Sequence, residues 1–349
     1  MINRKTNIHI ITSLFISYLY FLVITNLSAQ PLTRKVLFLG NSYTSVNDLP
    51  QITADAALSA GDTLIFDSNT PGGYTLGYHL FDNTSINKIK AGGWDYIVLQ
   101  EQSQLPSFEN FDNFYYYSSW LCDTINHYNP CARTMFYMTW GRKNGDASNC
   151  PNWPPVCTYN GMDSLLHLRY MEVASHNNAS VSPVGAVWKY VRQNYPGIEL
   201  YQSDESHPSV AGSYLAACCF YSALFKKDPN NITYDYSLNP TEAEEIRNAT
   251  KIVLFDSLQN WDFGKYLPSV DFFYSIGEGI NQVNFINKTL YADSYLWDFG
   301  DGSTSIADNP THNYAFNGSY TITLTASNCD FLEPHQATFQ RIINFCNYT

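Results

Sequence analysis

The stretch that decides the fold is Val36-Leu37-Phe38-Leu39-Gly40-Asn41-Ser42-Tyr43-Thr44. Its four leading apolar residues are typical of a short strand buried on both faces, and the Gly-Asn pair after them indicates a turn. Similar apolar runs recur at residues 63–66, 96–99, 134–138 and 198–201. Strands that alternate with helices at this spacing predict a mostly parallel sheet covered by helices on both faces, an α/β fold. The helical patterns fall near residues 49–60, 110–126, 160–176, 186–195 and 241–258.

Three chemically matched residues fall at strand ends in this arrangement. Ser42 follows the first apolar run, and Asp204 and His207 follow the last one. In parallel sheets the carboxyl ends of the strands share one edge, where ligands bind. A serine hydroxyl becomes a nucleophile when an imidazole takes its proton, and a carboxylate orients that imidazole. The sequence therefore predicts a Ser-His-Asp triad, although each residue alone could equally be a turn cap or a surface residue.

Four short motifs, in chain order, resemble the blocks of the SGNH (GDSL-like) hydrolase superfamily. They are Gly40-Asn41-Ser42, Gly72-Gly73, Gln100-Glu101-Gln102-Ser103 and Asp204-Glu205-Ser206-His207. The resemblance covers residues 35–262 and implies a three-layer, flavodoxin-like α/β fold with Ser42 as the nucleophile of an esterase. The first block departs from the family pattern, because Asn41 stands where the family has Asp.

The same resemblance implies an oxyanion hole, a set of N–H donors that holds the negative oxygen of the reaction intermediate. Its members would be the N–H groups of Ser42 and Gly73, with Gly72 as the close alternative and a plain turn as the simpler interpretation. An amide side chain from the third block would complete it. The family usually has Gly-x-Asn-Asp there, so we assign this role to Gln102, with Gln100 as second choice.

The residue pattern changes after about residue 268. Alternating, strand-like patterns replace the helical ones there and predict a small all-β sandwich. The run Trp297-Asp298-Phe299-Gly300-Asp301-Gly302-Ser303 and the later Asn309-Pro310-Thr311-His312-Asn313-Tyr314 resemble the polycystic kidney disease (PKD) domain. This resemblance implies an immunoglobulin-like sandwich that acts as a spacer or contacts polysaccharide or protein. We expect Asp298 and Asp301 to cap turns there, rather than to bind calcium.

The N-terminus has the layout of a secretory signal peptide. Arg4 and Lys5 precede the apolar residues 10–24, and a cleavage site near Ala29 follows. We expect a signal peptide over 1–29, a hydrolase domain over 30–265 and a sandwich over 268–349, with an uncleaved anchor as the alternative to cleavage. The mature protein is then secreted, periplasmic or bound to the cell surface, without a membrane span. The net charge of −12 for the full chain argues against nucleic acid and anionic membranes as partners.

Eight cysteines in an exported chain favour disulfides. Proximity suggests three pairs, although six cysteines alone permit about 15 connectivities; the pairs are Cys122 with Cys131, Cys150 with Cys157, and Cys329 with Cys346. Cys218 and Cys219 lie in an apolar helical run, where they are interpreted as small buried hydrophobes. No Cys/His cluster has the spacing of zinc ligands, so the sequence predicts neither a catalytic metal nor another cofactor.

Two tryptophans are candidates for the substrate rim, namely Trp140 after a strand end and Trp153 between two cysteines, though a rigid surface insertion explains the second equally well. The sequence thus predicts a secreted serine esterase. Its Gln-containing third block resembles that of carbohydrate-acting SGNH esterases, which favours an acetylated glycan as the substrate. The alternatives are a lipase or general carboxylesterase, and a non-catalytic glycan-binding or adhesion protein that retains the hydrolase fold.

Overall fold

The computed structural model describes residues 30–263, 268–279, 281–328 and 336–345. The predicted signal peptide, residues 266–267 between the two expected domains, and the predicted pair of Cys329 with Cys346 lie outside these ranges. Among the helices of the described ranges, none is both long enough and apolar enough to cross a membrane.

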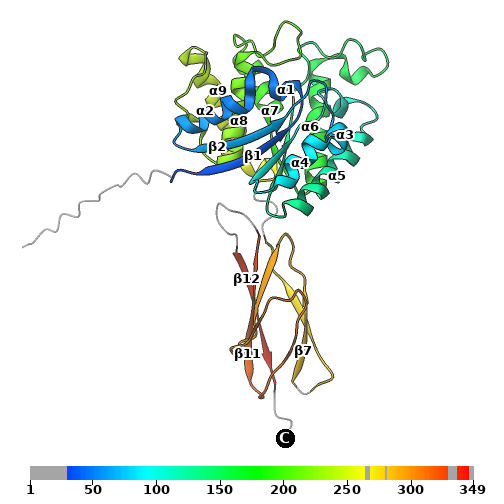
Figure 1. The fold of residues 1–349 in the computed structure, drawn as a ribbon, viewed down its shortest axis with the longest axis vertical. Coiled ribbons are helices and arrows are strands. Elements are labelled where there is room, and N and C mark those ends of the chain that lie inside the picture. The colour runs from blue at the N-terminus through cyan, green and yellow to red at the C-terminus, as the bar shows by residue number, and fades with distance from the viewer. Residues whose placement is uncertain (1–29, 264–267, 280, 329–335, 346–349) are drawn as a thin grey trace, which may run out of the picture. The chain divides into compact units, whose positions relative to one another are not determined.

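A parallel five-stranded sheet forms the centre of the first part of the chain (Figure 1). Its strand order is β2-β1-β3-β4-β5, and each neighbouring pair is parallel. The strands are β1 (Thr33–Leu39), β2 (Thr63–Asn69), β3 (Tyr96–Leu99), β4 (Arg133–Tyr137) and β5 (Ser180–Ser182). The predicted α/β fold is confirmed, and the carboxyl ends of β1, β2 and β3, which precede the first three motifs, lie at one edge of the sheet.

Helices cover both faces of this sheet (Figure 1). One layer contains α2 (Leu49–Ser59), α7 (Val184–Asn194), α8 (Val210–Phe225) and α9 (Pro240–Val253), which pack on one another. The other contains α3 (Leu76–Phe81), α4 (Asn83–Ala91), α5 (Asp112–Tyr128) and α6 (Tyr159–His176). The short α1 (Ser42–Ser45) follows β1 directly. The parallel sheet and its two helical layers therefore form a three-layer flavodoxin-like fold.

The predicted strand at residues 198–201 is wrong. Ile198 and Leu200 are buried in alternation, as the pattern suggested, but the backbone hydrogen bonds of this segment do not join the sheet. The N–H of Ser209 donates to the carbonyl of Leu200, and Tyr201 forms an isolated antiparallel bridge with Pro208. The segment thus folds back on the His207 loop, and the fifth strand is instead the short β5.

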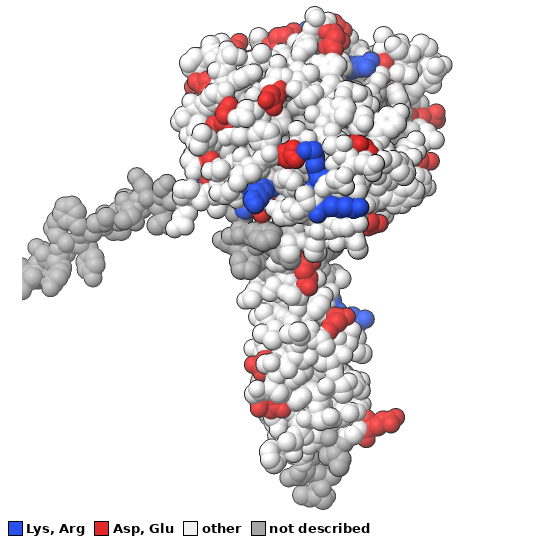
Figure 2. All heavy atoms as spheres, in the orientation of Figure 1, with Lys and Arg blue, Asp and Glu red and all other residues white. Residues whose placement is uncertain are grey.

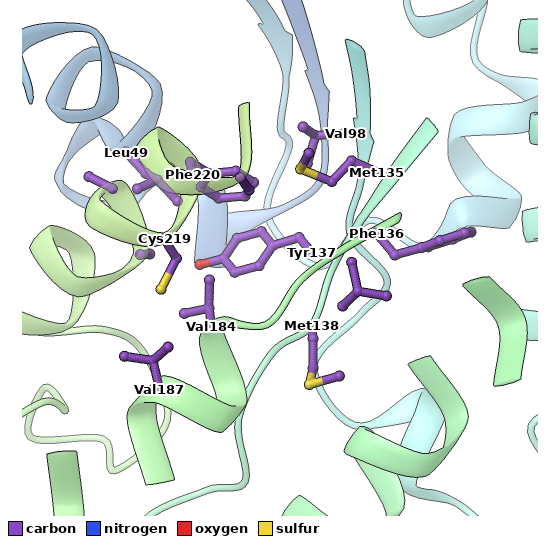
Figure 3. Close-up of a cluster of buried hydrophobic side chains, with 14 of the residues drawn as sticks. Leu49, Val98, Met135, Phe136, Tyr137, Met138, Val184, Val187, Cys219 and Phe220 are labelled. Atoms are coloured by element: carbon purple, nitrogen blue, oxygen red, sulfur yellow. The ribbon is translucent and has the colours of Figure 1, made fainter. Parts of the chain in front are cut away.

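The helix α8 is the most deeply buried of the described helices, and it begins three residues after His207. It is apolar around its whole circumference, which is typical of a helix enclosed by other elements. Figure 3 shows its Cys219 and Phe220 facing Tyr137 of β4, and the rings of Tyr137 and Phe220 lie 4.9 Å apart, edge to face. Ser209 caps the helix by accepting the N–H of Gly212. The loop before α8 is therefore anchored in the core.

The described residues between 272 and 344 form two antiparallel sheets, as the alternating pattern of this region predicted. One has the order β10-β7-β6 and the other β12-β11-β8-β9. The strands are β6 (Phe272–Ile276), β7 (Gln282–Asn287), β8 (Ser294–Asp298), β9 (Thr304–Ser305), β10 (Thr311–Asn313), β11 (Ser319–Ser327) and β12 (Gln336–Asn344). Trp297 and Tyr314 lie in the core between the sheets. The predicted β-sandwich is confirmed.

Turn capping by the two aspartates of this sandwich is confirmed as well. The Asp298 carboxylate accepts the N–H of Gly300, and that of Asp301 accepts the N–H of Ser303. The second oxygen of Asp301 lies 2.7 Å from Nε2 of His312. These carboxylates are engaged by their own turns.

The cysteines match the proximity pairs in part. Cys150 and Cys157 form the predicted disulfide. Cys122 has a free, buried thiol on α5, so its predicted pairing with Cys131 is wrong. Burial raises the pKa of the Cys122 thiol to about 12, which keeps it protonated. Cys218 and Cys219 are free and buried in α8, in agreement with their interpretation as small apolar residues.

Candidate active site

The structure brings the three candidate residues together in one hydrogen-bonded chain. Oγ of Ser42 lies 2.8 Å from Nε2 of His207, and Nδ1 of His207 lies 2.5 Å from Oδ2 of Asp204. An ionised carboxylate only accepts hydrogen bonds, so Nδ1 carries the ring proton and Nε2 accepts the Ser42 hydroxyl. This is the arrangement in which an imidazole can take the proton of a serine.

The loop that carries Asp204 and His207 is shaped by its own backbone. Oδ1 of Asp204 accepts the N–H groups of Ser206 and His207, at 3.1 and 3.0 Å. Partial burial alone would raise the pKa of Asp204, but hydrogen bonds from the His207 ring and these N–H groups lower it below its ordinary value. Glu205 adopts a left-handed φ of 62°, which reverses the chain between the two candidate residues.

A stack of aromatic rings packs against the loop that carries Asp204 and His207. Tyr43 stacks on Trp140 at 4.8 Å, and Trp140 stacks on Trp188 at 3.7 Å. The hydroxyl of Tyr43 bonds Oγ of Ser206, and Nε1 of Trp140 donates to the carbonyl of Ser206. Trp140 is fully buried, so its predicted place at the substrate rim is wrong. Its indole instead holds the His207 loop in position.

Gln100 lies in the buried layer under the first block. Its Oε1 accepts the N–H of Asn41 and the hydroxyl of Thr44, and its Nε2 donates to Oδ1 of Asn41 and to the carbonyl of Glu101. Both amide hydrogens are therefore used, and the side chain is fully buried. The second-choice assignment of Gln100 to the oxyanion hole is wrong, because this amide has no hydrogen left to offer.

Asn41 explains why this chain differs from the family pattern at that position. Its Oδ1 accepts both the N–H of Tyr43 and an amide hydrogen of Gln100. Its Nδ2 donates to the carbonyl of Tyr74 at 2.9 Å. An Asp could accept but not donate, so the amide allows one side chain to join the first, second and third blocks.

The N–H groups of Ser42 and Gly73 remain available for a ligand. Neither has a hydrogen-bond acceptor among the residues that the structure describes. Gly73 has a φ of 74°, a left-handed conformation that favours glycine, and a side chain there would meet open space. Both predicted backbone donors are thus free of internal partners.

Gln102 is held in the turn that follows the third block. Its Oε1 accepts the N–H groups of Gln104 and Leu105, at 2.9 and 3.2 Å. Its Nε2 lies 3.2 Å from Oε1 of Gln104 and 3.5 Å from Oγ of Ser103. Long contacts of this kind are weak. Its predicted part in the oxyanion hole stays a prediction.

Glu101 was overlooked by sequence reasoning. Its carboxylate accepts the N–H of Gln102 at 2.6 Å and the N–H of Leu76 at 3.2 Å, so it ties the third block to the start of α3. Burial raises the pKa of Glu101 to about 8, against the lowering effect of these two hydrogen bonds. A polar residue among Gln and Ser carries no sequence signal that distinguishes a buried carboxyl from an exposed one.

His79 is a second residue that the sequence did not single out. Its Nε2 lies 2.8 Å from the carbonyl oxygen of Gly40, and its Nδ1 lies 2.7 Å from Oγ of Ser85. Burial lowers the pKa of His79, which favours the neutral ring. The neutral imidazole donates to Gly40 and thereby fixes the turn that presents Ser42.

The segment that contains the disulfide, residues 146–157, packs against the turn that follows the third block. Nε1 of Trp153 donates to the carbonyl of Ser107, and Nε2 of Gln104 donates to Asp146 at 2.6 Å. Trp153 is half-buried against the main core. Its ring is therefore partly exposed beside the third block, and its contact with substrate stays a prediction. No cluster of three or more metal-ligating side chains occurs within the described ranges.

Comparisons with known proteins find separate matches for the parallel-sheet part and for the β-sandwich part of the chain. Residues 281–342 match the family model of the PKD domain. A DUF4886 family protein from Bacteroides uniformis has a TM-score of 0.56 and 19% identity, over 66% of this chain and 96% of that chain. A proposed SGNH hydrolase from Slackia heliotrinireducens has a TM-score of 0.47 and 24% identity, over 54% of this chain and 98% of that chain.

A curated relative matches a short part of the chain. Collagenase ColA of Bacillus cereus is 49% identical over 45 residues, which are 13% of this chain. The matched region spans 5% of that relative's length. The part of the chain with the parallel sheet thus shares its fold with the DUF4886 family protein, and the chain carries a C-terminal region similar to PKD domains.

Proposed function

We propose that this chain is a secreted serine esterase that removes acetyl groups from polysaccharide. The observation that carries the proposal is the hydrogen-bonded chain from Ser42 through His207 to Asp204, at the strand ends where ligands bind in parallel sheets. The likeness of the fold to SGNH hydrolases supports a hydrolase that acts on esters. The family resemblance of the third block supports an acetylated glycan.

The reaction proceeds in two halves. Oγ of Ser42 attacks the ester carbonyl carbon while Nε2 of His207 takes the hydroxyl proton, and Asp204 stabilises the imidazolium. The tetrahedral intermediate collapses, the C–O bond to the sugar breaks, and His207 gives its proton to the departing sugar hydroxyl. Water then attacks the acetyl-serine with His207 as the base, which releases acetate and restores Ser42.

The intermediate carries a negative oxygen that needs hydrogen-bond donors. The N–H groups of Ser42 and Gly73 serve this role in the proposal, and their lack of acceptors among the described residues supports it. Gln102 adds its Nε2 after giving up its weak contacts to Ser103 and Gln104. No metal or cofactor takes part in this mechanism.

Export and domain organisation belong to the same proposal. Residues 1–29 are removed as a signal peptide, residues 30–265 form the hydrolase domain, and residues 268–349 form the PKD-like domain. The disulfide between Cys150 and Cys157 supports an oxidising compartment outside the cytoplasm. The PKD-like domain contacts the polysaccharide or a protein at the cell surface.

Acetate release from acetylated xylan tests this function, with p-nitrophenyl laurate as the competing long-chain ester. We expect the full chain to release acetate, the Ser42→Ala variant to release none, and Ser45→Ala, an exposed neighbour on α1, to match the wild type. A strong preference for the laurate would identify a lipase. Absence of hydrolysis of every ester would identify a non-catalytic glycan-binding protein and overturn the proposal.

A further inference from the structure

A row of aromatic side chains begins beside the candidate site and continues over α3 and α5, which pack together (Figure 1). Ring centroids lie 5.6 Å apart for Tyr74 and Tyr78, 6.3 Å for Phe81 and Tyr117, and 5.9 Å for Tyr117 and Trp120. We call these five residues the aromatic row. Phe81 is 73% exposed, Tyr78 60% and Trp120 52%. Large exposed aromatic groups that gather in this way mark binding surfaces.

A cavity of about 290 Å³ opens within the row. Rings of Tyr78, Phe81 and Tyr117 line one part of it, and Thr75, Asn113 and Glu101 supply polar groups. Among its described lining residues, Leu105 is the one aliphatic side chain. The volume is at the lower end of small-molecule pockets, roughly 300 to 1,000 Å³.

One end of the aromatic row, Tyr74, lies beside the loop that carries Ser42. Tyr74 directly follows Gly73, and its carbonyl accepts Nδ2 of Asn41 at 2.9 Å. Asn41 is in turn the residue before Ser42 and also contacts the carbonyl of Glu101. A ligand in the cavity therefore lies against the same loops that hold the candidate oxyanion donors.

One ring of the row is fixed before any ligand arrives. A Cβ atom at Gly77 would lie 2.8 Å from the Tyr117 ring, closer than van der Waals contact allows. Glycine at this position therefore lets the Tyr117 ring lie against the α3 backbone. A ring held in this way loses little conformational entropy when a ligand stacks on it.

We propose that this groove binds the sugar units of the ester substrate, with pyranose rings stacked on the aromatic row. The inference rests on the proposed function, because it assigns the glycan side of the same site. A pyranose presents an apolar C–H face to an aromatic ring and hydroxyl groups around its edge. The combination of aromatic rings with the polar side chains of Thr75 and Asn113 matches both features.

The lining distinguishes a sugar from an acyl chain and from a charged glycan. A long acyl chain needs an aliphatic tunnel, whereas Leu105 alone supplies that chemistry here. Burial raises the pKa of Glu101 to about 8, so its carboxyl is protonated near neutral pH and adds no charge. Glu101 is the one ionisable carboxyl among the described lining residues, and Figure 2 shows Asp and Glu side chains scattered over that view of the molecule. The groove therefore fits a neutral glycan.

The ratio of kcat/KM for an acetylated xylo-oligosaccharide to that for p-nitrophenyl acetate tests the groove in the full chain. We expect Phe81→Ala and Tyr78→Ala, which remove rings that line the cavity, each to lower this ratio about five- to tenfold, the size of an aromatic stacking contact. Tyr116→Ala is the matched control, because Tyr116 lies on α5 next to Tyr117, is 55% exposed and does not line the cavity. Its ratio should equal that of the wild type.

Binding without turnover separates this inference from the proposed function. Calorimetry with the Ser42→Ala chain and the same oligosaccharide should show binding that Phe81→Ala, added to it, weakens about five- to tenfold. Such binding without any ester hydrolysis by the wild type would overturn the function and support the groove. Unchanged ratios and unchanged binding in both ring variants, or a wild-type preference for p-nitrophenyl laurate, would overturn the groove.

Discussion

The two sides of the candidate site are built in opposite ways. On the His207 side, the side chains of His207 and Asp204 are 31% and 46% exposed, and their hydrogen bonds lead to Ser42. On the third-block side, Gln100 and Glu101 are buried, and their hydrogen bonds hold neighbouring loops. The His207 side therefore offers the reactive groups, while the third-block side holds them in position. Substitutions should therefore separate loss of activity from loss of stability.

The largest effect is expected from Ser42→Ala on the exposed side. Loss of the nucleophile should lower kcat/KM for p-nitrophenyl acetate about 10³-fold or more. The free energy of unfolding should change by less than about 0.5 kcal/mol, because Ser42 makes no buried packing contact that alanine lacks. Steady-state rates and urea unfolding measure the two quantities. A variant that keeps a rate within about tenfold of the wild type would contradict the assignment.

Gln100→Ala should have the reverse signature. The change removes the acceptor of the Asn41 N–H and of the Thr44 hydroxyl. It also removes one of the partners of the Asn41 side chain and of the Glu101 carbonyl. Unpaired buried groups each cost about 1 to 3 kcal/mol, so we expect the free energy of unfolding to fall by about 3 kcal/mol or more. Gln102→Ala, in the partly exposed turn, is the control and should lose about 1 kcal/mol. Equal losses would remove the distinction between the two glutamines.

Glu101→Gln tests the buried side by its pH dependence. Burial raises the pKa of Glu101 from 4.5 to about 8 in the folded chain. Between these values the folded state holds a proton that the unfolded state has released, so stability falls as pH rises, by about 1.4 kcal/mol per pH unit. Urea unfolding of wild type and variant from about pH 5 to 8 should give a difference with that slope. Parallel curves would show that Glu101 is ionised throughout.

The smallest effect is expected from removing the disulfide at the predicted substrate rim. The disulfide between Cys150 and Cys157 has a sequence separation of 7. Short loops lose little entropy on closure, so the double variant Cys150→Ser/Cys157→Ser should lower the free energy of unfolding by about 2 kcal/mol. Thermal unfolding measures the loss. A much larger loss, above about 4 kcal/mol, would show that this segment is part of the scaffold that holds the third block.

The same contrast explains what the sequence could predict. Ser42 follows the strand β1, as predicted, but Asp204 and His207 follow a segment that is not a strand of the sheet. Strand direction therefore placed Ser42, whereas the order of the motifs placed Asp204 and His207. Fold class followed from the rhythm of strands and helices. The strand β5 did not, because Ser180-Val181-Ser182 offers one apolar residue to detect. Residues 198–201 misled because burial gives the same alternation whether the backbone pairs with a sheet or with residues 207–209.

Buried roles were the hardest to foresee. An aromatic residue after a strand end gives the same pattern at the rim and in the core, and Trp140 is buried because Tyr43 and Trp188 stack on it from distant parts of the chain. Gln100 and Gln102 are chemically identical in the sequence, yet only the fold decides which amide is consumed internally. The support that His79 gives to Gly40 likewise depends on a contact across 39 positions.

Labelling by a fluorophosphonate probe, followed by intact-mass spectrometry, tests the central claim most directly, because the probe reacts with an activated serine. We expect the wild type and the Ser45→Ala control each to gain one adduct, located at Ser42 by peptide mapping. Ser42→Ala should gain none. Equal labelling of the wild type and Ser42→Ala, or no labelling of the folded wild type, would contradict the claim that His207 and Asp204 activate Ser42.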